Sequence, residues 1–80
     1  MSNEYQTSDF PTAITLLVLK HVLKGLDKRD IRRASFQFEH SPKLSADLEA
    51  LRGGKIKVDP FEFWYAQKRL KQILYEDQQL

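Results

Sequence analysis

The three prolines of this chain constrain its fold more than any other residues, because each closely follows a side chain that caps helices. Proline is tolerated in the first turn of a helix, where its missing N–H would have no partner anyway. A Ser or Asp side chain just before that turn accepts a hydrogen bond from its free amides. The combinations are Ser8 or Asp9 with Pro11, Ser41 with Pro42, and Asp59 with Pro60. The sequence therefore predicts three helices that begin near residues 9, 42 and 60.

Two strands are predicted between the first and second helices. The first helix ends near residue 19 or 20, and residues 22–27 and 32–39 then have the composition of strands. In the second of these, Phe36 and Phe38 alternate with polar neighbours, which is the period of two typical of a half-buried strand. Residues 28–31 would turn the chain, so we expect the two strands to form a hairpin.

The second and third helices have clear ends as well as clear starts. Leucines recur at helical spacing after residue 42, and Gly53-Gly54 ends that helix with residues that accept left-handed geometry. Residues 55–58 alternate between polar and apolar and form an optional short third strand. The last helix is predicted to continue to about residue 75 or 76.

The predicted fold class is α+β: a small single domain of order α-β-β-α-α, in which helices cover a β-hairpin. It is expected to span residues 8–80, after a flexible N-terminal segment of residues 1–7. The first helix is apolar nearly all round, which predicts burial on more than one side. A chain of this length buries only about 60% of its unfolded surface, so the apolar faces should share one core. The residues predicted for that core are Ile14, Leu17, Val18, Phe36, Phe38, Leu48, Leu51, Phe63, Leu70 and Leu74.

Several kinds of site and location are excluded by what the sequence lacks. There is no cysteine, which excludes disulfides and thiolate metal sites, and the two histidines show no metal-binding spacing. The longest apolar stretch, residues 16–19, is far shorter than the roughly 20 residues of a membrane span. The first residues do not resemble a signal peptide. We therefore expect a cytoplasmic protein that is not an enzyme, with no metal, cofactor, small-molecule substrate or membrane partner.

The last predicted helix carries aromatic side chains outside its core-facing stripe. These are Phe61, Trp64, Tyr65 and Tyr75, and three basic residues stand among them. Trp64, Lys68, Lys71 and Tyr75 follow one another at i, i+4, i+7 and i+11, and so form one line along the helix, called here the aromatic row. In one interpretation these side chains border the core and pack on the first helix or the hairpin, as aromatics with a polar tip often do.

In a second interpretation the aromatic row is exposed and binds a partner. Lysine and arginine would then contact phosphates while aromatic rings stack on bases, as in binders of single-stranded nucleic acid. Aromatic residues are also the enriched anchors of protein interfaces, for which we consider Phe61, Trp64, Tyr65 and Tyr75. A third possibility is a homodimer that buries the row between two copies.

Positive charge is concentrated in residues 20–33, which carry a net charge of +4. Within them Lys28, Arg29, Arg32 and Arg33 would make a positive ridge on the hairpin, able to attract a polyanion. Such runs are more often solvated surface or protection of a strand edge. The favoured hypothesis is a small non-enzymatic accessory protein that binds single-stranded DNA or RNA with low sequence specificity. The alternative is a protein–protein interaction module, or a small modulator of a larger host or phage machine.

Three short motifs resemble a small prokaryotic family of domains of unknown function. They are Asp9-Phe10 at the first helix, Phe36-Gln37-Phe38-Glu39-His40-Ser41-Pro42, and Gly54-Lys55-Ile56-Lys57-Val58-Asp59-Pro60 before a final amphipathic helix. The resemblance covers roughly residues 9–75. The chain departs from the family pattern at His40, where members carry an acidic residue, and at Pro11, where they carry a tyrosine-like or small one. The resemblance implies the α-β-β-α-α order, and it implies no activity because the family has none assigned.

Overall fold

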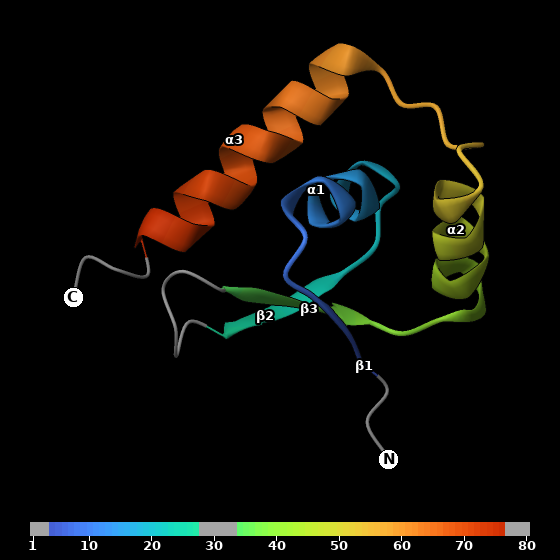
Figure 1. The fold of residues 1–80 in the computed structure, drawn as a ribbon. Helices are drawn as coiled ribbons and strands as arrows, with labels where there is room; N and C mark the ends of the chain where they lie inside the picture. Colours follow the sequence, from blue (N-terminus) through green and yellow to red (C-terminus); the bar gives the residue numbers. More distant parts are fainter. Residues whose placement is uncertain (1–3, 28–33, 77–80) are drawn as a thin grey trace.

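The computed structural model describes residues 4–27 and 34–76 and shows a three-stranded sheet with three helices (Figure 1). The α+β fold class and the predicted hairpin are confirmed. The elements in chain order are β1 (Glu4–Thr7), α1 (Phe10–Val18), β2 (Leu23–Asp27), β3 (Ser35–Glu39), α2 (Pro42–Arg52) and α3 (Pro60–Glu76).

All three helices begin where the prolines predict, and side-chain caps explain why. At each start, a side-chain oxygen accepts hydrogen bonds from amides of the first turn, which otherwise have no partner inside the helix. Asp9 accepts from Thr12 N at 3.1 Å, Ser41 from Leu44 N at 3.0 Å, and Asp59 from Phe61 N at 2.7 Å. The helix starts are therefore fixed by local chemistry.

The sheet is antiparallel with β3 in the centre, in the order β1-β3-β2. Tyr5 and Leu23 lie opposite Phe38 from the two sides, so these three side chains share the sheet face that meets the helices. The expectation of a flexible segment before residue 8 is wrong for residues 4–7, which form β1. β1 has one apolar side chain in four, and only its pairing with the long-range partner β3 makes it a strand.

The optional strand at residues 55–58 is not formed, and these residues connect α2 to α3 instead. Its alternation has another cause: Ile56 and Val58 are half-buried while Lys55 and Lys57 are exposed. The same pattern therefore arises in an irregular connection that turns its apolar side chains inward. The third strand of the sheet is β1.

The core lies between the sheet and the helices, and α1 is its central element. α1 lies over one face of the sheet and α3 packs against α1 (Figure 1). The Phe10 and Phe36 rings, 5.7 Å apart, join α1 to the sheet. The fully or nearly fully buried apolar residues are Ala13, Ile14, Leu16, Phe36, Phe38, Leu44, Ala66 and Leu70. Burial of α1 on more than one side is thus confirmed.

The predicted core residues are confirmed in most positions. Ile14, Phe36, Phe38 and Leu70 are buried, and Leu17, Val18, Leu48 and Phe63 pack against them half-buried. Leu51 and Leu74, which were predicted to be core residues, are only half-buried because they lie near the C-terminal ends of their helices. Leu16 is buried although it lies outside the main apolar face of α1, because α1 has neighbours on several sides.

A polar contact joins α2 to the connection between α1 and β2. His21 Nε2 lies 2.6 Å from Asp47 Oδ2, and Lys43 Nζ donates to the same oxygen at 3.0 Å. The hydrogen bonds from His21 and then Lys43 lower the pKa of the Asp47 carboxyl below its usual value. Together with the buried Leu44, this contact holds α2 beside the sheet.

Candidate nucleic-acid interface

The aromatic row of α3 lies at the surface. Leu70 is completely buried and Phe63 packs on the core, so the helix is rotated as predicted. On the opposite side Trp64 is 49% exposed and Tyr75 56% exposed, and Lys68 and Lys71 are exposed between them. The interpretation in which these aromatics pack inside the domain is therefore wrong, and an exposed row is what the structure presents.

Two neighbours flank the Trp64 ring. Lys68 Nζ lies 4.4 Å from the centre of that ring, a cation–π contact one helical turn away. The Tyr65 ring lies 5.2 Å from the Trp64 ring at 58° between their planes. Because the Lys68 side chain is long and exposed, its ammonium can leave the ring when a better partner arrives.

The start of α3 extends the exposed aromatic surface. Phe61 and Tyr65 are 71% and 60% exposed, so all four aromatics predicted off the core stripe are accessible. Of the charged side chains that the structure describes on α3, Lys68, Arg69 and Lys71 are basic and only Glu62 is acidic. The exposed side of the helix thus combines aromatic rings with net positive charge.

The predicted basic ridge of the hairpin lies outside the described residues. The ridge consists of Lys28, Arg29, Arg32 and Arg33. The described part of the chain stops at Asp27, the last residue of β2, and begins again at Ala34, just before β3. Their proposed role in phosphate binding therefore stays a prediction.

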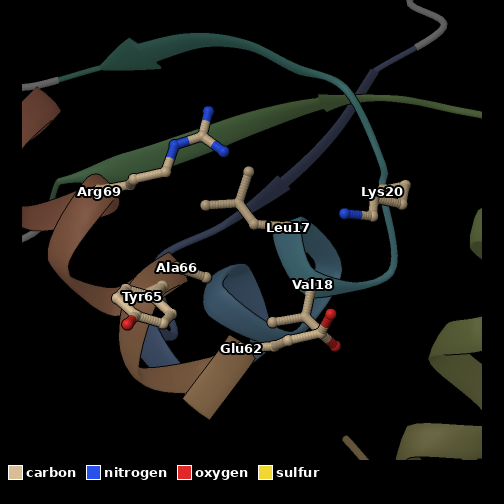
Figure 2. A pocket seen from close by; sticks show the side chains of 7 residues that line it. All are labelled: Leu17, Val18, Lys20, Glu62, Tyr65, Ala66 and Arg69. Atoms are coloured by element: carbon tan, nitrogen blue, oxygen red, sulfur yellow. The ribbon is translucent and has the colours of Figure 1, made fainter. Parts of the chain in front are cut away.

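A groove between α1 and α3 was not predicted from the sequence. One part is a cleft of about 160 Å³ (Figure 2), lined by Leu17, Val18, Lys20, Glu62, Tyr65, Ala66 and Arg69. An adjoining hollow of about 390 Å³ shares Leu17, Lys20 and Arg69 with it and continues to β2. We call the two together the α1–α3 groove. It arises from the packing of two helices far apart in sequence, and no local motif signals it.

The end of α1 places Lys20 in an unusual backbone conformation. The N–H of Lys20 donates to the Leu17 carbonyl and that of His21 to the Leu16 carbonyl, both at 3.0 Å. This pair of hydrogen bonds is the Schellman motif, in which the first residue beyond the cap adopts left-handed geometry and is usually glycine. Lys20 has a φ of 70° and is the only non-glycine residue with positive φ in the described chain. This conformation could not be predicted from the sequence, because no glycine stands at position 20.

The histidines take part in hydrogen bonds, and neither belongs to a recognisable metal site. His21 contacts Asp47, and His40 lies 3.1 Å from the Ser45 hydroxyl at the surface. No group of three or more His, Cys, Asp or Glu side chains that could hold a metal is found in residues 4–27 and 34–75. Within the described helices, none is both long and apolar enough to cross a membrane.

Comparison of the chain with protein families, with curated proteins and with solved structures finds no match. The structure itself shows a small α+β domain that presents an aromatic and basic helix.

Proposed function

We propose that the protein is a non-enzymatic accessory protein that binds single-stranded DNA or RNA through the exposed side of α3, with little sequence specificity. The observation that carries this proposal is the exposure of the aromatic row, in which Lys68 and Lys71 lie between Trp64 and Tyr75 along one line. Single-strand binders combine these two chemistries, since every base has a flat face to stack and every nucleotide has a charge.

The energetics of the Trp64 site favour a base over the resident lysine. A cation–π contact at an exposed site is worth about 0.5–1 kcal/mol, whereas a base stacked on an aromatic ring is worth about 1–3 kcal/mol. A base that takes the place of Lys68 on the ring also frees its ammonium for the adjoining phosphate. The contact seen at 4.4 Å is then the resting arrangement of a group that changes partner on binding.

Trp64 also supplies the most direct test, because it is the only tryptophan in the chain. Titration with a single-stranded oligonucleotide at low salt should quench or shift its fluorescence, since the base would lie on the indole ring. Fluorescence anisotropy of a labelled oligonucleotide gives the affinity in parallel. No binding at micromolar protein and low salt would refute the proposal.

Variants of Trp64 distinguish stacking from simple apolar contact. Trp64→Leu keeps an apolar side chain but removes the ring, and we expect it to weaken binding by about 1–3 kcal/mol with an unchanged salt dependence. Trp64→Phe should retain part of the affinity. Equal affinities for the wild type and the Leu variant would show that no base stacks there.

The charged part of the row has its own signature. For single strands, the logarithm of the binding constant falls linearly with the logarithm of the salt concentration, with a slope of about 0.7 per phosphate contact. Replacing both Lys68 and Lys71 by Ala should therefore reduce this slope by about 1.4. The matched control replaces Lys55 and Lys57, two exposed lysines in the connection before α3, with the same change in net charge. An equal effect of both double variants would indicate general charge attraction only.

A second candidate function is favoured by exposed apolar residues that stacking does not require. Phe61 is 71% exposed, and the aliphatic Val22 and Ile73 are 56% and 37% exposed. Such residues suit a protein partner, either a larger complex that this protein modulates or a second copy of the chain. Light scattering over a hundredfold concentration range tests the homodimer, and a constant monomer mass would exclude it.

A further inference from the structure

We infer that the α1–α3 groove is a second phosphate-binding site for the same strand, with Lys20 and Arg69 as its cations. This inference rests on the proposed function and extends it from the aromatic row to the neighbouring side of α3. The ligand it names is a phosphodiester of single-stranded nucleic acid.

The backbone at Lys20 is the first observation. A φ of 70° in the Schellman position suits glycine, which has no Cβ to clash there, and a lysine in that position is strained. Residues held in such conformations are concentrated at ligand sites, where the side chain has a use that offsets the strain. Here the conformation sets the direction in which the Lys20 side chain leaves the end of α1.

The charges of the groove are the second observation. In Figure 2 the Lys20 ammonium and the Arg69 guanidinium lie on either side of Leu17, and the Glu62 carboxylate lies beside Val18. Neither Lys20 nor Arg69 forms an ion pair with a carboxylate among the residues that the structure describes. Two cations flanking an apolar floor attract an anion more strongly than the same charges on an open surface, because the low-dielectric wall focuses their field.

Continuity with the aromatic row identifies the anion as a phosphodiester. Tyr65 lines the groove and its ring also stands 5.2 Å from the Trp64 ring, so one side chain joins the two surfaces. A strand with a base on Trp64 can therefore pass Tyr65 and bring a phosphate to Lys20 and Arg69. A polyanion contacts these cations together with Lys68 and Lys71, whereas an isolated carboxylate would contact one or two of them.

The test uses the strain at Lys20 to separate binding from folding. Lys20→Gly removes the charge and relieves the backbone, so its thermal midpoint should equal or exceed that of the wild type. Its affinity for a labelled single-stranded oligonucleotide should fall about fivefold at 0.1 M salt, with the salt slope reduced by about 0.7, the value for one lost contact. Lys20→Arg keeps the charge and should bind as the wild type does.

Arg69→Gln should reproduce the binding loss, and Lys57→Ala, which removes an exposed charge outside the groove, is the control. If Lys20→Gly loses no more affinity than Lys57→Ala while Trp64→Leu still weakens binding, the groove site is refuted and the proposed function stands. If the wild type binds no oligonucleotide, both are refuted. Preferential binding of a glutamate-rich peptide that depends on Lys20 would assign the groove to an acidic protein partner and overturn the inference.

Discussion

Leu70→Ala should destabilise the domain strongly, because this single side chain anchors α3 in the core. Leu70 is completely buried, and the substitution removes three carbon atoms. At about 0.8 kcal/mol per buried methylene, their transfer to water accounts for about 2.4 kcal/mol. The cavity left behind raises the expected loss into the range of about 2.5–4 kcal/mol, within the range of about 2–5 kcal/mol for such substitutions.

This loss is large for a domain of 80 residues. At about 0.05–0.15 kcal/mol per residue, the whole chain has an unfolding free energy of about 4–12 kcal/mol. Urea unfolding followed by circular dichroism measures the change, with the m-value checked for constancy. The variant should lose about a fifth of its stability or more and show a clearly lower midpoint.

Ile73→Ala is the matched control on the same helix. It also removes three carbon atoms, but Ile73 is 37% exposed, and alanine favours the helix over a β-branched residue. We expect a loss of about 1 kcal/mol. If the two variants lose equal stability, α3 is not docked through Leu70, and the orientation that exposes the aromatic row would be refuted with it.

Two further predictions concern the polar contacts that fix α2. The Asp47 pKa is lowered in the fold from 3.8, so the contribution of Asp47 to stability is present above about pH 4 and is lost as the pH falls through the folded pKa. The difference in stability between the wild type and Asp47→Asn should therefore shrink as the pH falls from about 5 to about 2. A constant difference over this range would contradict the prediction. Ser41→Ala removes the cap that accepts from Leu44 N and should destabilise by about 1 kcal/mol in urea unfolding. Ser45→Ala, which removes only the exposed hydrogen bond between Ser45 and His40, should change stability by less than about 0.5 kcal/mol.

The parts of the fold that the sequence predicted are those fixed by neighbouring residues. Asp9, Ser41 and Asp59 cap helices through bonds to amides two or three residues away, so a single short window contains the whole cause. The alternation at Phe36 and Phe38 is equally local. The burial of Leu70 opposite Trp64 follows from helical period alone, which is why the rotation of α3 was predicted correctly.

The parts that the sequence did not predict depend on residues far apart in the chain. β1 is mostly polar, and its strand exists because β3, about thirty residues later in the chain, offers it a free edge. The α1–α3 groove needs the end of α1 beside the middle of α3, which no motif records. Whether Trp64 was packed or exposed also depended on neighbours, because an aromatic beside a core stripe suits both situations.

The central position of α1 explains how so small a domain leaves the aromatic row uncovered. α1 is buried along Ala13, Ile14, Thr15 and Leu16, so it supplies apolar surface to the sheet and to α3 at the same time. α3 therefore needs only a narrow stripe around Leu70 to dock, and more than half of its circumference stays accessible. Extending the docking stripe would add stability but would bury the rings and cations that the proposed function uses. The wide exposed side of α3 is thus a consequence of how α1 is packed, and the proposed binding surface and the core are built from opposite sides of one helix.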